Sequence, residues 1–588
     1  MRKLLRFLNH YKMESILAPL FKLLEASFEL FVPLVMAAII DVGIAGKDYA
    51  YIWKMGALLV LLAVVGLAAS LTAQYFAARA AVGFSARLKH ELLEHIQKLS
   101  FGDMDLMGTS TMITRMTSDV NQVQAGVNLV LRLFMRSPFI VFGAMIMAFT
   151  VDVQAALVFV VAIPLLSLVV FGVMALSIPR YKKVQDALDK LLGRTRENLT
   201  GARVLRAFHK QGEEREHFTG ENQELNRLQQ SVGRIAALMN PITYLILNGA
   251  IIALIWTGAV RVDMGVLSQG QVVALINYMS QILVELVKLA NLIVSVNKAV
   301  ACGNRIQEIF ELEPGLTGPE TEETWPEEVE AKRLKEMAPE TGDAVVFEHV
   351  GLVYPGASEE SLTDIHFSVK KGEVIGVIGG TGSGKTSLVH LLPRFYDITA
   401  GRLLIDGVEA GQYNLRGLRE KVGIVLQKSV LFQGTIRSNL LWGRKDATEE
   451  ELWQALRIAQ AEEIVRQKKD GLDEKVEQEG RNFSGGQKQR LAIARALVRR
   501  PDILILDDSA SALDYATDAA LRKAIGEELT DMTLFIVSQR TASVRNADKI
   551  VVLEDGRMAG LGTHEQLRET CEVYREICKA SERGGSKV

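Results

Sequence analysis

The sequence contains little cysteine and almost no net charge, and each shortage excludes a class of protein. Its three cysteines, Cys302, Cys571 and Cys578, lack the paired spacing of a zinc site and the density of a disulfide-stapled domain, so we interpret them as ordinary thiols. Basic residues number 67 against 69 acidic ones, which gives no indication of a nucleic-acid partner. At 588 residues the chain is too long for one hydrophobic core, and we expect several domains.

Long apolar runs, by contrast, are plentiful in the first 300 residues. Each approaches or exceeds the ~20 residues with which a helix crosses a bilayer. Prolines interrupt several runs, which membrane helices tolerate where neighbouring helices pair the freed backbone groups. The first run is too long for a signal peptide and contains Glu25 and Glu29. The six predicted spans are 15–40, 55–78, 126–150, 153–177, 240–261 and 270–296.

Basic residues are concentrated in two connections between these runs. Segment 177–233 carries eleven, and segment 79–125 carries five. We therefore expect the protein to lie in the inner or plasma membrane of the cell. The positive-inside rule places both connections and both chain termini on the cytoplasmic side. Both connections have helical periodicity, so we expect the spans to continue as helices and to turn back near 108–119 and 201–212.

The composition changes after residue 310. Segment 311–342 is acidic, contains proline and is poor in aliphatic residues, which is typical of a flexible linker; a short helix could form within 327–337. Strand and helix patterns then alternate over 343–582. The predicted fold class is a multi-domain membrane protein, with an all-α transmembrane domain of six helices (1–310) followed by an α/β domain (343–582).

The α/β domain contains GGTGSGKT at 379–386, directly after the apolar strand pattern EVIGVI, which indicates a nucleotide-binding domain of P-loop type. The motif matches G-x-x-x-x-G-K-[ST], in which backbone N–H groups cradle phosphates. We expect Lys385 to reach the β- and γ-phosphates of ATP and the Thr386 hydroxyl to bind Mg²⁺. The predicted ATP-binding residues of this segment are Gly379, Gly380, Thr381, Gly382, Ser383, Gly384, Lys385, Thr386 and Ser387.

A second apolar strand pattern, ILILDD, ends in Asp507 and Asp508. Its leucine and isoleucine content suits a buried parallel strand that ends at the nucleotide. Asp507 is then placed to organise the Mg²⁺ ion.

Between the two motifs lies NFSGGQKQRLAIARAL, at 482–497. SGGQ at the start of a basic helix resembles the signature of ATP-binding cassette (ABC) ATPases, and with six spans ahead of it the whole chain resembles an ABC exporter half-transporter. The resemblance implies that two cassettes pair head to tail, with each ATP between the Walker motifs of one chain and the signature of the other. It further implies that Tyr354 stacks on adenine, that Gln427 is the Q-loop glutamine beside the metal, and that Ser511 and Asp514 belong to the D-loop. The residues implied to contact the partner chain's ATP are Ser484, Gly485, Gly486 and Gln487.

Two residues depart from the family pattern near the γ-phosphate. Asp508 stands where a glutamate usually activates water, and its side chain is roughly 1.5 Å shorter; a misplacement of about 1 Å can cost on the order of 10²-fold in rate. Gln539, in IVSQR, replaces the switch histidine with a neutral amide that cannot shuttle a proton. We therefore predict a degenerate catalytic site that binds MgATP but hydrolyses it slowly. Its dimer partner would be a different half-transporter, with Glu and His at these positions.

The predicted activity is ATP-driven export of a small amphipathic compound or drug. Two alternatives stay open: a homodimeric exporter of lipid or peptide that hydrolyses through Asp508, and an ATP-gated regulatory or channel-like subunit. Segments 107–120 and 200–214 resemble the coupling helices that dock on the cassettes.

Glu25, Glu29, Glu285 and Lys288 are ionisable residues inside the predicted spans. Glu285 and Lys288, three residues apart in the sixth, are expected to pair with each other. For Glu25 and Glu29, in the first, a polar patch for cationic amphiphiles and simple packing both remain open.

Overall fold

A computed structural model describes residues 3–312, 315–316, 333, 342–509, 513–529 and 531–585. The chain divides into two compact units. One, the helical unit, contains residues 1–97 and 110–311, and the other, the α/β unit, contains residues 98–109 and 312–588. Three predictions fall wholly or mostly outside the described residues: the flexible linker 311–342, the short helix within 327–337, and the D-loop residue Ser511.

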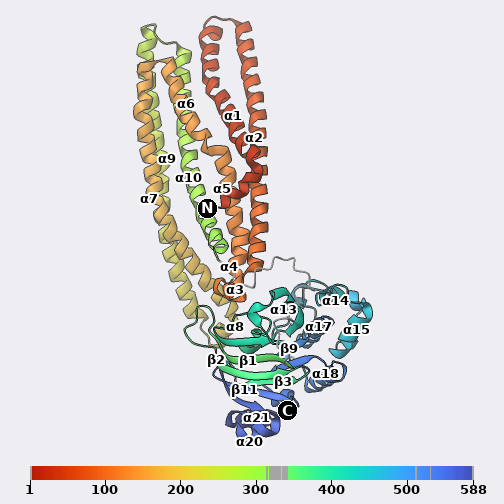
Figure 1. Cartoon of the computed structure of the whole chain (residues 1–588). Coiled ribbons are helices and arrows are strands. Elements are labelled where there is room, and N and C mark those ends of the chain that lie inside the picture. The colour runs from red at the N-terminus through yellow and green to blue at the C-terminus, as the bar shows by residue number, and fades with distance from the viewer. Residues whose placement is uncertain are drawn as a thin grey trace. The chain divides into compact units, whose positions relative to one another are not determined.

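The helical unit contains six helical stretches that are long and apolar enough to cross a membrane, as counted over the described residues (Figure 1). This confirms the six predicted spans. The stretches are Leu4–Ile44 (η1 Leu4–Tyr11, α1 Lys12–Ala38, η2 Ile39–Ile44), Tyr49–Lys98 (α2), Thr109–Val151 (α4 Thr109–Thr114, η3 Arg115–Asp119, α5 Val120–Leu129, η4 Val130–Phe134, α6 Arg136–Val151), Val153–Thr200 (α7), Gln211–Asp263 (α9) and Gln269–Phe310 (α10).

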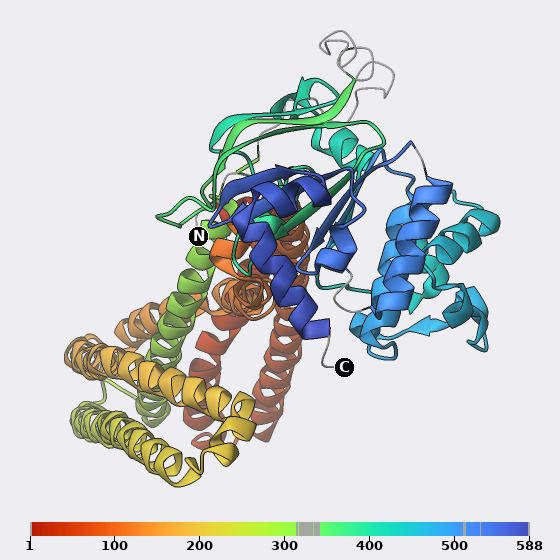
Figure 2. The same cartoon turned by 90° about the horizontal axis from the view of Figure 1, so that it is seen from below.

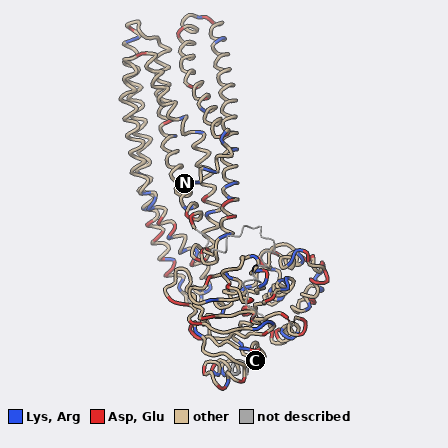
Figure 3. Tube along the Cα trace, viewed as in Figure 1, with Lys and Arg blue, Asp and Glu red and all other residues tan. Residues whose placement is uncertain are grey.

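These stretches extend well past the thickness of a bilayer. The 48 residues of α7 span roughly 72 Å at ~1.5 Å per residue, against ~30 Å of hydrocarbon. Charged residues gather along the parts of α7 and α9 nearest the short helix α8 (Ala202–Ala207), and the opposite ends have few (Figure 3). The spans therefore continue as polar helices, as the sequence predicts.

Small residues allow the helices of this unit to pack closely. The core between α1, α6, α7, α9 and α10 contains many buried alanines, among them Ala144 on α6 and Ala274 on α10. The Tyr278 hydroxyl of α10 donates a hydrogen bond to the backbone oxygen of Leu30 on α1, at 2.7 Å. Helix α10 thus contacts the first stretch as well as the third.

The third stretch is interrupted inside the unit. Two π-helical segments, η3 and η4, occur in it, and its last helix, α6, begins anew at Arg136 after Met135. Pro138 stands in the first turn of α6, where its missing N–H group has no intrahelical acceptor to lose. The break places Arg136 at a helix start.

The first turn-back segment lies earlier than predicted. Helix α2 ends at Lys98, and the short helix α3 (Phe101–Met107) begins with a capping box between Ser100 and Asp103. Gly108, with φ of +76°, ends α3 in a conformation that glycine adopts without strain. The predicted turn near 108–119 was therefore wrong, because Gly108 closes the crossing segment and 109–119 already belong to the third stretch. Helix α8 lies within the second predicted segment, 201–212.

The α/β unit is built on a six-stranded sheet of order β12-β11-β3-β10-β9-β6 and an antiparallel sheet of order β2-β1-β4-β5. Strands β11, β3, β10, β9 and β6 are parallel neighbours, so their carboxyl ends share one edge. The strands are β1 Asp343–Leu352, β2 Leu362–Lys370, β3 Val374–Gly379, β4 Ala400–Ile405, β5 Val408–Glu409, β6 Val422–Val425, β7 Gly434–Thr435, β8 Lys475–Val476, β9 Ile503–Asp507, β10 Thr533–Ser538, β11 Lys549–Glu554 and β12 Arg557–Gly562.

Helices cover the six-stranded sheet, and those of residues 436–528, in cyan and light blue, gather beside the sheets (Figure 2). Strands β3, β9 and β10 are buried along their length, which fits their near-continuous aliphatic sequences. The helices are α12 Lys385–His390, η5 Ala410–Gln412, α13 Leu415–Lys421, α14 Ile436–Leu440, α15 Glu449–Ile458, α16 Glu462–Arg466, η6 Gly471–Asp473, η7 Gln478–Gly480, α17 Gly485–Val498, α18 Tyr515–Glu528, α19 Thr541–Val544, α20 His564–Thr570 and α21 Glu572–Gly585.

Candidate nucleotide-binding site

The glycine-rich loop connects the buried strand β3 to helix α12. Gly382 and Gly384 have φ of +83° and +93°, a region that side chains with a Cβ rarely adopt. At Gly379, a Cβ would lie 2.2 Å from the backbone oxygen of Leu553 on β11. The loop can therefore keep this tight shape only with glycine at these positions.

Lys385 lies at the centre of the loop. Its ammonium group donates to the backbone oxygens of Gly379 and Gly380, at 3.0 and 2.5 Å. Burial lowers the pKa of Lys385, and the nearby charges of Asp508 and Asp507 oppose that shift. An anionic phosphate here would meet a partly desolvated cation, where charge pairing is stronger than in water.

Asp507 ends strand β9 and is 1% exposed. The Thr386 hydroxyl donates to its Oδ1 at 3.1 Å. Burial raises the pKa of Asp507 to about 6, with a further contribution from the Asp508 charge. A hydroxyl and a carboxylate in contact form the oxygen-only donor set that Mg²⁺ prefers. The residues therefore fit the predicted magnesium site.

Asp508 follows with φ of +45°, a conformation that aspartate tolerates better than most residues. Its Oδ2 accepts a hydrogen bond from the Gln427 side chain at 3.3 Å, and burial raises its pKa. Gln539 comes directly after strand β10 and is exposed. Because β9 and β10 are parallel neighbours, both departures from the family pattern reach the same edge of the sheet.

These residues surround a cleft of about 660 Å³. It brings together most of the predicted site from four separate segments of sequence. It also includes acidic and small residues near 360 and 555 that the sequence analysis missed, because they join the site only through strand pairing. The lining residues are Ala357, Glu359, Glu360, Ser361, Thr381, Gly382, Ser383, Gly384, Lys385, Thr386, Ser387, Gln427, Asp507, Asp508, Val537, Gln539, Asp555 and Gly556.

Three further side chains support the loop from outside this lining. The Tyr354 hydroxyl donates to the Ser387 hydroxyl at 2.8 Å, and the Tyr354 ring packs edge-on against Tyr396, with centroids 4.8 Å apart. His390, which the sequence analysis missed, has its Nε2 3.7 Å from the Asp507 carboxylate. The sequence signal that could have indicated His390 is its position on α12 shortly after Lys385.

The SGGQ segment lies apart from this cleft. Ser484 caps α17 through a capping box, with Gln487 N donating to the Ser484 hydroxyl at 3.4 Å and Ser484 N donating to the Gln487 side chain at 3.1 Å. No atom lies within 4 Å of a Cβ added at Gly485, so the helix start is open. Asp514 caps α18 by accepting from Thr517 N at 2.8 Å. None of Ser484, Gly485, Gly486, Gln487 or Asp514 lines the cleft.

Comparisons with known proteins identify this arrangement. Residues 15–286 match the family described as ABC transporter transmembrane region, and residues 362–511 match the family described as ABC transporter. An uncharacterized ABC transporter ATP-binding protein of Mycobacterium tuberculosis (strain H37Rv) is 35% identical over 563 residues, which cover 95% of this chain and 94% of the relative.

Two other relatives carry more specific names. YgaD of Bacillus subtilis (strain 168), whose name assigns it provisionally to multidrug export, is 30% identical over 98% of both chains. An ATP-dependent lipid A-core flippase of Syntrophus aciditrophicus is 30% identical over 82% of this chain and 78% of its own.

Among solved structures, a bacterial Atm1-family ABC exporter with ATP bound has the same fold. It gives a TM-score of 0.78 at 21% identity, over 97% of this chain and 98% of that one. The fused spans, the glycine-rich loop and the relatives over nearly the full length agree. The chain belongs to the ABC transporters and is a half-transporter of the exporter type, in which a transmembrane domain and an ATP-binding domain are fused.

Proposed function

We propose that the chain is one subunit of a heterodimeric exporter of small amphipathic compounds or drugs. Its own Walker side binds MgATP and hydrolyses it slowly, and residues 484–487 complete the competent site of a different partner chain. The observation that carries the proposal is that Asp508 and Gln539 line one cleft, while the residues that bind MgATP are intact.

Phosphoryl transfer to water depends mainly on positioning and on electrostatic stabilisation. Asp508 is one carbon–carbon bond shorter than glutamate, and its carboxylate is bonded to Gln427. Gln539 offers a neutral amide, which can contact a phosphate oxygen but cannot move a proton. When bound, Mg²⁺ neutralises charge on the phosphates; Thr386 and Asp507 would hold it, with Gln427 beside them. The chain's own residues thus suit binding better than hydrolysis.

In this proposal the protein lies in the inner or plasma membrane of the cell, with both termini and the ATP-binding domain in the cytoplasm, because the long basic helix extensions follow the positive-inside rule. The domain limits we propose are 1–310 for the membrane domain, 311–342 for the linker and 343–582 for the ATP-binding domain. Residues 98–109, which belong to the α/β unit, are a coupling segment in this scheme.

The test compares ATP hydrolysis by the purified chain with that of a Asp508→Glu, Gln539→His double variant. We expect the chain alone to bind ATP but to hydrolyse it slowly, and the double variant to gain on the order of 10²-fold in rate. Lys385→Ala is the control for loss of binding. Hydrolysis by the unmodified chain at rates ordinary for the family would overturn the proposal and favour the homodimeric alternative.

The names of relatives support more than one class of transported compound. YgaD supports export of drugs, and the lipid A-core flippase supports the lipid alternative. A competition assay with an amphipathic drug and a phospholipid, in vesicles that hold the assembled transporter, separates the two classes.

A further inference from the structure

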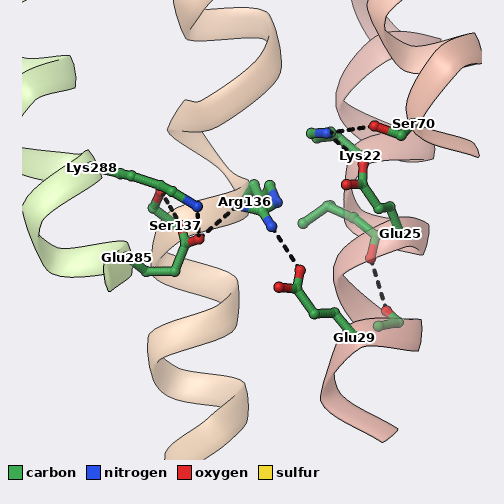
Figure 4. Close-up of polar contacts among 10 residues, drawn as sticks. Lys22, Glu25, Glu29, Ser70, Arg136, Ser137, Glu285 and Lys288 are labelled. Carbon is green, nitrogen blue, oxygen red and sulfur yellow. Dashed lines mark hydrogen bonds and ion pairs between the residues drawn. The ribbon is translucent and has the colours of Figure 1, made fainter. Parts of the chain in front are cut away.

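Six charged side chains lie close together inside the helical unit, in two groups (Figure 4). In the first group, Lys22 of α1 donates to Glu25 at 2.5 Å and to the Ser70 hydroxyl of α2 at 3.0 Å. In the second, Arg136 of α6 donates to Glu29 of α1 and to Glu285 of α10, each at 2.7 Å. The second group therefore connects three helices.

The second group lies at the depth of the hydrocarbon layer. Glu29 is fifteen residues from the end of its stretch at Ile44, Arg136 is fifteen from Val151, and Glu285 is sixteen from Gln269. At ~1.5 Å per residue these charges lie roughly 23 Å from the helix ends, within the ~30 Å of a bilayer core. Arg136 also stands where the third stretch changes from the π-helical segment η4 to α6, and π-helical turns inside helices frequently occur at functional sites.

Without Lys288, the charges of this group are not balanced. Glu29, Arg136 and Glu285 together carry one excess negative charge when both carboxylates are ionised. Lys288, which donates to Glu285 at 2.8 Å, supplies the balancing positive charge. Burying unbalanced charge in a medium of low dielectric is costly, so the three residues need a cation nearby.

The members of the group differ sharply in exposure. Side chains of Arg136 and Glu285 are 9% and 3% exposed, and both Glu285 oxygens are occupied, since Ser137 donates to the second at 2.8 Å. Glu29 and Lys288 are 40% and 44% exposed. Among the described residues, only one oxygen of Glu29 accepts a hydrogen bond. The group thus has a fixed interior and two accessible ends.

Exposed charges at membrane depth face a water-filled cavity or a partner rather than lipid. Apolar side chains accompany them: Met36, two turns from Glu29 on α1, is 38% exposed, and Val284, one turn before Lys288, is 51% exposed. An accessible carboxylate beside accessible apolar side chains is complementary to an amphipathic ligand that carries a cationic group.

We propose that Glu29 binds the cationic group of the transported compound, and that the positive charge of Lys288, which is held at Glu285 in the same network, opposes this binding. This inference depends on the proposed export of amphipathic compounds and names the residue that selects their charge. Lys22 and Glu25 take no part, since Lys22 is buried and the two are paired with each other.

Two ions of the same shape and opposite charge test the inference: tetraphenylphosphonium and tetraphenylborate. Their binding is measured without nucleotide, on the full chain in lipid nanodiscs, together with its partner half-transporter where one co-purifies. We expect Glu29→Gln to weaken binding of the cation about tenfold and to leave the anion no weaker. We expect Lys288→Met to do the reverse, with tighter binding of the cation and weaker binding of the anion.

Opposite shifts from two variants of one network cannot result from a general loss of folding. Asp263→Asn, an exposed carboxylate at the end of α9, is the control and should change neither ion. Equal effects of Glu29→Gln on both ions, or weaker cation binding in Lys288→Met, would show that the network only holds the helices together. The binding assay needs no ATP. A failure of the assembled transporter to transport in vesicles would therefore contradict the proposed function and leave the binding result for Glu29 unchanged.

Discussion

Asp507 meets two opposing demands. To hold the proposed Mg²⁺ ion it would need to be ionised, yet it is almost fully buried, which disfavours the charge and raises its pKa to about 6. A carboxyl whose pKa is higher in the folded than in the unfolded chain binds protons preferentially in the folded state. Stability should therefore fall as the pH rises from about 4 to about 6, and the cost should remain above that range.

We predict that Asp507→Asn makes the nucleotide-free protein more stable at pH 7.5, by on the order of 1–3 kcal/mol, while removing the stabilisation by MgATP. The amide does not titrate and can still accept from Thr386. Thermal unfolding with and without MgATP, at pH 4.5 and 7.5, measures both effects. The gain should shrink at the lower pH; an equal gain at both pH values would contradict the assigned cause.

At the scale of elements, α3 is held against the α/β fold by specific side-chain contacts. The ring of Phe101 lies 4.4 Å from that of Phe395, and the Tyr396 hydroxyl donates to Asp105 at 2.6 Å. Tyr396 in turn packs on Tyr354, which is bonded to Ser387 beside the phosphate loop. A continuous chain of contacts thus leads from the turn-back segment to the nucleotide cleft.

We predict that Gly102→Ala disrupts this contact, because the new Cβ would lie 2.7 Å from Pro355 Cγ. Overpacking of this kind typically costs about 1–3 kcal/mol. ATP-driven transport should fall at least fivefold, roughly the effect of 1 kcal/mol, while the affinity for MgATP stays within about twofold, since no cleft residue changes.

The matched control is Gly212→Ala, in the second turn-back region, where no atom lies within 4 Å of an added Cβ. Transport by this variant should match that of the unmodified chain. Equal losses in both variants would show that glycine flexibility, and not the docking of α3, is what matters.

At the scale of the whole molecule, the proposed function has one chain contribute parts of two different sites. The phosphate loop lines the cleft, but residues 484–487 do not. In a family whose members dimerise, the open start of α17 is where a partner's ATP would be contacted, since backbone N–H groups at a helix start favour an anion.

We predict that Gly485→Val lowers ATP hydrolysis by the assembled pair at least tenfold, because the side chain would occupy the space of the partner's nucleotide. The variant should leave the melting temperature of this chain and its own ATP binding unchanged, because no atom of the described residues lies within 4 Å of a Cβ added there. Gly526→Val on α18, equally free of neighbours, is the control. Unchanged hydrolysis in Gly485→Val would exclude pairing through this helix start.

A transport measurement distinguishes an ATP-driven exporter from an ATP-gated regulatory or channel-like subunit. We predict that vesicles holding the assembled transporter accumulate an amphipathic cation against its gradient only with ATP and Mg²⁺, and that Lys385→Ala abolishes the uptake. A regulatory or channel-like subunit would instead let the compound equilibrate, with ATP changing only the rate.

Much of this protein could be predicted from short stretches of sequence. Apolar runs long enough to cross a bilayer, a glycine pattern that only one loop shape satisfies, and a serine that caps its own helix are all local properties, and the structure has each of them. The pairing of Glu285 with Lys288, three residues apart on one helix, was predictable for the same reason and is confirmed at 2.8 Å.

Other features were decided only by the tertiary structure. Arg136, which the sequence analysis passed over, pairs with residues 107 and 149 positions away, and no local pattern indicates such partners. The position of α3 depended on whether Gly108 begins or ends the crossing segment, which follows from packing against Phe395 and Pro355. The sequence by itself determined the spans and the phosphate loop, because backbone sterics and helix periodicity act over a few residues. The charged network and the cleft needed the fold, because Coulomb and packing energies depend on distances in space.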